Sequence, residues 1–206
     1  MHISEGILNP PIWLTGYAAT AVIAGLTMRK LDMEEVPKIS VITAVFFIAS
    51  LIKIPLGPAS IHLILNGLVG IVLGKRAFAA IMLGIILQAI IFGHGGITVI
   101  GINTLMLGGG ALVAYFVWQQ RYRFNIKRRE FVFGAIAGAI GTVTSGTILA
   151  SVLMLTGEEF TTIAETVLIA HIPIMLIEAA VVGASAEFLQ KTKPEVLAGN
   201  KSTVST

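Results

Sequence analysis

Seven apolar segments, separated by short polar loops, constrain the fold of this 206-residue chain more than any other feature. Hydrophobic residues make up 55% of the chain and charged residues only 12%, whereas soluble domains carry about 25% charged residues. A soluble core in so short a chain cannot hide that much apolar surface, so the composition predicts a polytopic membrane protein. The expected segments are 10–28, 39–54, 60–74, 77–92, 98–118, 131–155 and 163–189.

The fold expected from these segments is an all-α membrane protein, a bundle of about seven transmembrane helices. Residues 1–190 would form a single integral-membrane domain, followed by a polar cytoplasmic tail over 191–206. Segment 60–74 would span only about 22 Å as a helix, which is less than the hydrocarbon core, so we expect other helices to shield it from lipid. The small residues of GAIAGAIGTVTSG (134–146) predict a face of close helix packing.

The basic residues predict the orientation of the bundle. If seven segments cross the membrane, 13 of the 14 Lys and Arg residues fall on one side, and only Lys53 falls on the other. Because basic loops face the cytoplasm, the N-terminus is expected outside and the C-terminus inside. The net charge of +3 is confined to these loops and does not indicate a nucleic-acid partner. The basic loop and tail residues are Arg29, Lys30, Lys38, Lys75, Arg76, Arg121, Arg123, Lys127, Arg128, Arg129, Lys191, Lys193 and Lys201.

The N-terminal stretch MHISEGILNP contains a possible metal chelate. It lacks the basic region of a signal peptide, since the first basic residue is Arg29, and Met1 is therefore the expected mature N-terminus. The α-amine of Met1, the backbone nitrogen of His2 and the His2 imidazole could close two fused rings on one ion. A fourth nitrogen would complete a square, which suits Ni(II) or Cu(II) better than Zn(II). The dipeptide alone also fits the commoner case of an ordinary interfacial histidine.

The other polar groups at membrane depth are few, and each has a structural alternative. His62 and Asn66 are spaced i, i+4 and would share one face if 60–74 is helical. His94 lies in the glycine-rich turn FGHGG, where a satisfied loop residue and a group that orients a metal ligand are equally acceptable readings. His171 and Glu178 share a face of the last segment and could form a proton path, but helix packing is the favoured interpretation for both. Gln88 and Asn103 are the remaining strong amides at depth.

Four stretches of the sequence resemble the CbiM/NikM family, the substrate-binding membrane subunits of energy-coupling-factor (ECF) cobalt and nickel transporters. MHISEG is similar to the MHIxEG opening of that family, and residues 57–74 resemble its Ser-x-His-Leu segment. The block QAIIFGHGGITVIGINTLMLG (88–108) and the stretch HIPIMLIEAAVVG (171–183) resemble two further family segments, in the family's order. The likeness covers nearly the whole chain.

The resemblance implies a function and a ligand set. The N-terminus would bend into the helical core, where the Met1 amine, both His2 nitrogens and the His62 imidazole hold Ni²⁺ or Co²⁺ as the transported ion. His94, Asn66, Gln88 and Asn103 are candidates for orienting these ligands; many family members have aspartate where this chain has His94. The implied partners are a transmembrane coupling subunit, a cytoplasmic ATPase and a small accessory membrane protein of the CbiN/NikN type, all at the prokaryotic inner membrane.

Two other classes of membrane protein fit this sequence less well than a transporter subunit does. An intramembrane metalloenzyme would need an open metal position and a nearby general base, and Glu178 is seven residues from His171 rather than in a His-Glu-x-x-His arrangement. A passive cation channel would need rings of acidic residues along a pore, and the apolar segments contain almost none. The chain also lacks a Walker A motif, so ATP hydrolysis is expected to belong to a partner.

Overall fold

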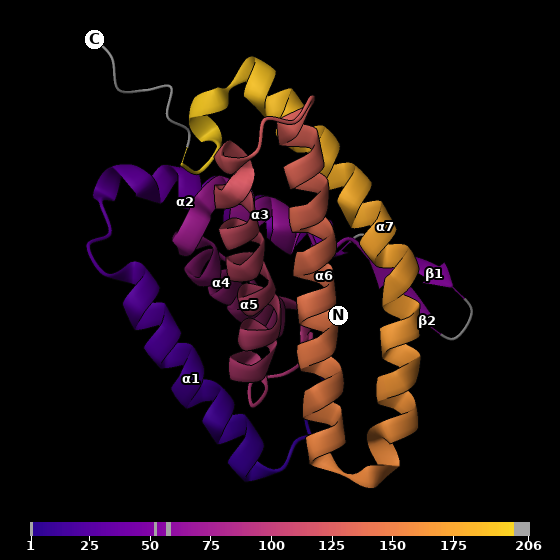
Figure 1. The fold of residues 1–206 in the computed structure, drawn as a ribbon. Coiled ribbons are helices and arrows are strands. Elements are labelled where there is room, and N and C mark those ends of the chain that lie inside the picture. Colours follow the sequence, from indigo (N-terminus) through magenta and orange to yellow (C-terminus); the bar gives the residue numbers. More distant parts are fainter. Residues whose placement is uncertain (1, 52, 57–58, 200–206) are drawn as a thin grey trace.

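The computed structural model is a helical bundle with one small β-hairpin (Figure 1). It describes residues 2–51, 53–56 and 59–199, with backbone only for the described residues between 53 and 62. The elements in chain order are α1 Pro10–Met28, η1 Met33–Glu35, α2 Val36–Leu51, β1 Lys53–Leu56, β2 Ala59–His62, α3 Asn66–Leu73, η2 Gly74–Arg76, α4 Ala77–Phe92, α5 Ile100–Gln119, η3 Gln120–Arg123, α6 Arg129–Thr156, η4 Glu158–Phe160, α7 Thr161–Thr192 and η5 Pro194–Val196.

The helical membrane architecture predicted from composition is confirmed in its coarse form. The described chain has seven α-helices, but only five stretches are long and apolar enough to cross a membrane. The number of membrane crossings and the orientation of the termini therefore stay predictions. The five stretches are Pro10–Met28, Asn66–Phe92, Ile100–Arg123, Arg129–Thr156 and Glu158–Thr192.

The prediction of a helix over 60–74 is wrong at its start. Residues 59–62 form strand β2, which pairs with β1 in antiparallel register, His62 opposite Lys53. The third helix begins only at Asn66, because Leu65 adopts a left-handed conformation (φ 52°, ψ 13°) that a continuous right-handed helix excludes. His62 and Asn66 therefore do not share a helical face. The second apolar segment likewise ends as a helix at Leu51, and its last residues belong to β1.

Helix α3 lies at the centre of the bundle, as expected for a segment shielded from lipid. It contacts α4, α5, α6 and α7, and nearly all of its residues are buried. Glycines allow this close approach: a Cβ at Gly67 would come within 2.7 Å of the Gly138 Cα on α6, and one at Gly70 within 2.3 Å of the Ala111 oxygen on α5. By contrast, α1 lies at the edge of the bundle and is mostly exposed (Figure 1).

Helices α6 and α7 form the most extensive helix pair in the molecule. A Cβ at Gly138 would meet the Glu178 carbonyl oxygen at 2.7 Å, and one at Gly134 would meet the Ala186 Cβ at the same distance. The predicted small-residue packing face of 134–146 is thus confirmed.

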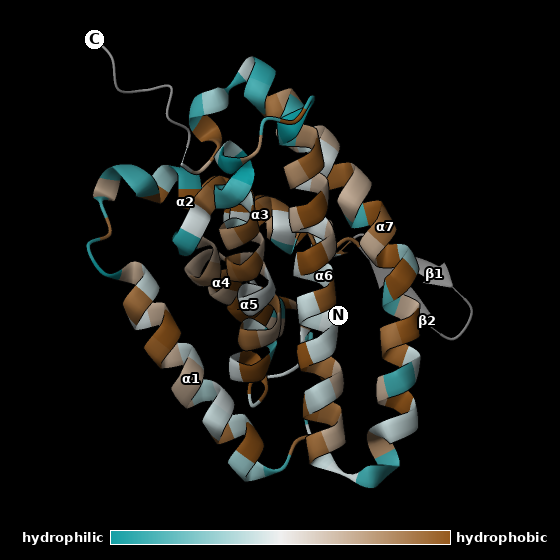
Figure 2. Ribbon diagram, in the orientation of Figure 1, coloured by the Kyte–Doolittle hydropathy of each residue, from teal (hydrophilic) through white to brown (hydrophobic). Residues whose placement is uncertain are grey.

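The polar connections gather at the end of the bundle that carries the C-terminus, where Figure 2 shows the most hydrophilic ribbon. Buried Arg76, in the connection from α3 to α4, holds the connection from α1 to α2. Its guanidinium donates to the carbonyls of Thr27 (2.5 Å), Arg29 (3.1 Å) and Lys30 (2.8 Å) and to Glu35 Oε2 (2.8 Å). A cavity of about 310 Å³ lies beside this cluster.

The described part of the predicted tail packs against the same end of the bundle. The Ala198 amide donates to the Ile71 carbonyl at 2.9 Å, and the Ala198 carbonyl accepts from the Trp118 indole at 3.1 Å. Leu197 is buried in the core. The Arg121 guanidinium stacks on the Trp118 ring at 4.1 Å and also donates to Ala198.

Candidate metal site

The N-terminal segment is anchored inside the bundle by the side chain of Asn103. The Ile3 amide donates to Asn103 Oδ1 at 2.9 Å, and Asn103 Nδ2 donates to the Ile3 carbonyl at 3.1 Å. Both residues are buried, and the Ile3 side chain is only 2% exposed. One amide therefore satisfies both main-chain groups of Ile3, as a neighbouring strand would. This places His2 at the edge of the core, with its Nε2 atom buried.

The loop between α4 and α5 forms the other wall of this region. The His94 ring lies 6.2 Å from the His2 ring and 5.8 Å from the Phe92 ring, between centroids. Gly95 (φ 79°) and Gly96 (φ 107°) follow in left-handed conformations that favour glycine. A Cβ at Gly95 would come within 2.7 Å of Asn103 Nδ2, so the expected close backbone approach in this turn is present.

Two contacts that the sequence did not single out also join this loop to the N-terminal segment and to α1. The Thr98 amide donates to Glu5 Oε1 at 3.4 Å, and the Tyr17 hydroxyl donates to the Ile97 carbonyl. A Cβ at Gly96 would collide with the Glu5 side chain. The position of Glu5 inside MHISEG was the available signal, because a charged residue so close to a proposed chelate needs a partner.

The remaining amide candidates serve different neighbours. Gln88 Nε2 donates to Ser50 Oγ at 2.6 Å and so joins α4 to α2, while the main-chain carbonyl of Gln88 accepts from the His94 amide at 3.2 Å. The main chain of Gln88 is thus hydrogen-bonded to the turn that carries His94. Asn66 Nδ2 donates to Ser145 Oγ at 2.7 Å and to the Gly141 carbonyl at 3.1 Å, which ties α3 to α6.

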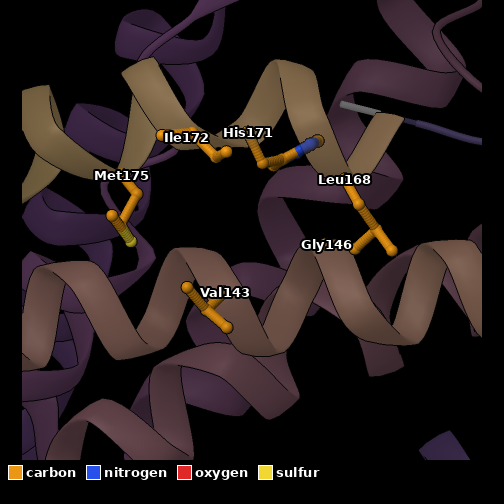
Figure 3. Close-up of a pocket in the computed structure, with 6 residues that line it drawn as sticks. All are labelled: Val143, Gly146, Leu168, His171, Ile172 and Met175. Atoms are coloured by element: carbon orange, nitrogen blue, oxygen red, sulfur yellow. The ribbon is translucent and has the colours of Figure 1, made fainter. Parts of the chain in front are cut away.

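His171 packs between helices, in agreement with the favoured reading. Its Nδ1 donates to the Val167 carbonyl at 2.5 Å, and a Cβ at Gly146 would lie 3.2 Å from its Cγ. It borders a cavity of about 70 Å³ between α6 and α7 that is otherwise apolar (Figure 3). The lining residues are Val143, Gly146, Leu168, His171, Ile172 and Met175.

Two of the predicted ligands lie outside what the structure describes. Met1 is outside the described residues, and His62 is described by its backbone alone, at the end of β2. Among the described residues, no group of three or more His, Cys, Asp or Glu side chains lies close enough to hold a metal. The proposed donor set is of another kind, because three of its four nitrogens belong to the first two residues of the chain.

The turn after β2 is held by a carboxylate from α7. Glu178 Oε1 accepts from the Ile64 amide at 2.5 Å and from the Leu65 amide at 2.9 Å. Glu178 is completely buried. Sequence reasoning identified it as a carboxylate within a span but assigned it to helix packing, because nothing in the sequence relates it to a turn 113 residues earlier.

The structure is that of an integral membrane protein with five candidate spans, in which buried Ile3 is anchored to the bundle by Asn103. Residues 2–196 match the family described as "Cobalt uptake substrate-specific transmembrane region" (CbiM), and the chain belongs to this family. The predicted CbiM/NikM resemblance is therefore confirmed.

Individual relatives and solved structures agree with this family. The chain is 34% identical to a Haemophilus influenzae protein assigned to metal transport, over 96% of this chain and 97% of that protein. It is 27% identical to the cobalt transport protein CbiM of Sorangium cellulosum, over 96% and 94%. A crystal structure of a transition metal transporter has a TM-score of 0.81 and 22% identity, covering 93% of each chain, and shows the same fold. These comparisons indicate a transporter membrane component rather than a catalytic enzyme.

Proposed function

We propose that this protein is the substrate-binding subunit of an ECF-type importer in a prokaryotic inner membrane, and that it captures Ni²⁺ or Co²⁺ from outside. The ligands are the Met1 amine, the backbone and imidazole nitrogens of His2, and the His62 imidazole. A coupling subunit, a cytoplasmic ATPase and a small accessory membrane protein then drive uptake. A fused nickel transport protein NikMN of Rhodobacter capsulatus, 32% identical over 74% of this chain and 46% of its own length, supports the accessory partner.

The observation that carries this proposal is the pair of hydrogen bonds between Asn103 and Ile3. A chain terminus with a free amine normally extends into solvent. Here residue 3 is buried and held at both main-chain groups, and the Nε2 atom of the adjacent His2 is buried, which supports a ligand role for the start of the chain. Three nitrogens on two adjacent residues favour a square arrangement, which suits Ni(II).

Metal binding by purified protein tests the proposal. Protein with a native N-terminus should bind one Ni²⁺, and an uncleaved extension before Met1 should abolish binding, because it converts the amine into an amide and adds bulk to a buried segment. His2→Ala and His62→Ala should each lose the metal, while His94→Ala should weaken binding by about 10–100-fold if it only orients a ligand. His171→Ala, a histidine in the α6–α7 contact, is the matched control and should bind normally.

Two outcomes would contradict the ligand set. Unit nickel stoichiometry with the N-terminal extension in place would exclude the amine. An equal loss of binding from His94→Ala and His62→Ala would mean that the fourth ligand is misassigned. The partnership is tested separately, by metal uptake in cells with and without the coupling subunit and the ATPase.

A further inference from the structure

Glu178 is a fully buried carboxylate whose partners are main-chain amides of a distant segment. It lies in the middle of α7, and its Oε1 accepts from Ile64 and Leu65, which join β2 to α3. Its Oε2 has no hydrogen-bond partner among the described residues. A buried carboxylate at membrane depth is costly, so its retention calls for a function beyond filling space.

The turn 63–65 needs an external acceptor because of its conformation. Leu65 is in the left-handed conformation, which residues other than Gly, Asn and Asp rarely adopt, and the surrounding structure has to hold it there. The amides of Ile64 and Leu65 precede the first helical residue of α3, where no earlier turn of helix supplies carbonyl acceptors. Ile64 and Leu65 are both buried, so bulk water cannot replace these acceptors. A single carboxylate oxygen, with two lone pairs, satisfies both amides.

This turn also sets where His62 lies. Helix α3 is fixed to α5 and α6 by the contacts of Gly67 and Gly70, which leave no room for a side chain. Only residues 63–65 connect that fixed helix to the end of β2, where His62 is located. Strand β2 also pairs with β1 and contacts α2, so a change in the turn would shift His62 relative to α3 and the helices packed on it rather than release the strand.

We infer that Glu178 is a positioning residue for metal capture, which holds the turn 63–65 and thereby places His62 for coordination. The inference rests on the proposed function, because it requires His62 to be a ligand. Positioning of His62 is distinct from two other roles that Glu178 could have, which are helix packing and attraction of the cation by its charge. The three roles predict different results for substitutions at position 178.

Two substitutions separate position from charge. Glu178→Gln is neutral but keeps the length and one carbonyl oxygen, so it can still accept from both amides, and it should bind Ni²⁺ within about threefold of wild type. Glu178→Asp keeps the carboxyl group but is one methylene shorter, so it cannot reach both amides, and it should weaken binding about 10–100-fold, as removal of a ligand-orienting group does. If the carboxylate acts by charge, the order reverses: Asp retains affinity and Gln loses it.

A matched control and a double-mutant cycle separate positioning from general stability. Val182→Ala opens a cavity one turn away on α7, at a residue that is fully buried, and should lower the melting temperature without changing Ni²⁺ affinity. At nickel concentrations high enough to load His62→Ala through its three remaining nitrogens, adding Glu178→Asp should cause no further loss of affinity, because its effect passes through His62. At the same nickel concentrations, the absorption spectrum of the Glu178→Asp protein should shift towards that of His62→Ala.

The outcomes distinguish this inference from the proposed function. Wild-type affinity of Glu178→Asp, or an additional loss in the His62→Ala background equal to that in wild type, overturns the positioning role. If His62→Ala itself binds Ni²⁺ like wild type, the proposed ligand set fails whatever the substitutions at Glu178 do. If Glu178→Asp does not fold, the positioning role is tested by Glu178→Gln, which is expected to fold, with Val182→Ala as the control. Loss of nickel affinity in folded Glu178→Gln overturns the inference.

Discussion

Replacement of Asn103 by leucine should release the N-terminal segment from the bundle. Leucine has a similar shape but no polar atoms, so the Ile3 amide and carbonyl would both lose their partners while Ile3 is 2% exposed. An unsatisfied buried main-chain group costs about 1–3 kcal/mol, and we take about 2–4 kcal/mol for the pair, because partial undocking lets water reach them. That corresponds to a roughly 30- to 1000-fold shift in the docking equilibrium.

The effect on metal affinity should be smaller than the effect on docking. Burial of the Ile3 and Leu8 side chains still favours the docked segment, by about 1.5–3 kcal/mol each. Affinity falls only in proportion to the loss of the docked population. We therefore expect nickel affinity to fall at least about tenfold, and amide exchange of residues 3–5 in the metal-free protein to accelerate.

Matched variants test this reasoning. Asn103→Asp keeps an acceptor for the Ile3 amide but replaces the Nδ2 donor with an oxygen facing the Ile3 carbonyl, so it should not rescue binding. Asn9→Ala removes another Asn side chain near the same segment. That side chain is exposed, and its hydrogen bond to the Thr156 carbonyl is long (3.4 Å), so the substitution should not change nickel affinity. Wild-type nickel affinity and unchanged amide protection in Asn103→Leu would refute the argument.

Two further predictions concern the opposite end of the bundle. The Arg76 guanidinium donates two hydrogen bonds to Glu35 and lowers the pKa of that carboxyl below its usual value. The resulting stabilisation is present above the usual glutamate pKa and is lost as pH falls through the folded-state pKa. Glu35→Gln should therefore flatten the acid side of a profile of melting temperature against pH, and an unchanged profile would contradict this. Removing residues 194–206 should lower the free energy of unfolding by about 2–5 kcal/mol, because the burial of Leu197 and the hydrogen bonds of Ala198 are lost. Thermal unfolding of the truncated protein measures this loss. An unchanged melting temperature would show that the docked tail does not contribute to stability.

Helix positions were predictable where local chemistry marks the ends. The helices at Pro10–Met28 and Ala77–Phe92 begin and end where the sequence indicated. Consecutive prolines open the first, and Gly93, in a left-handed conformation, closes the second. These signals act within a few residues, so a single sequence contains them.

The start of α3 was not predictable, because its cause is a tertiary contact. Residues 60–65 are as apolar as the helix that follows, and hydrophobicity alone cannot separate a buried strand from a buried helix. The turn at Leu65 separates strand β2 from helix α3, and the Leu65 amide donates to Glu178, which is 113 residues further along the chain. No local pattern relates the two.

The roles of the buried amides were unpredictable for a related reason. A helix that is hydrophobic on all sides gives no indication of which face a single polar residue occupies. Asn66 and Asn103 are equivalent by sequence, yet one joins α3 to α6 and the other holds Ile3. The resemblance to the family placed both near the ligands, and only the packing of the helices separates their contacts.

The two halves of the proposed site are anchored on different helices, and this sets what fixes the distance between them. The N-terminal half is held by Asn103 on α5, and the turn that leads from His62 is held by Glu178 on α7. Helix α6 packs against both, through Gly138 towards Glu178 and through Gly141 towards α5. Backbone contacts across glycine leave little room for adjustment. The spacing of the two anchors is therefore determined by the packing of three helices rather than by loops, which is the rigid support that a coordination geometry accurate to about half an ångström requires.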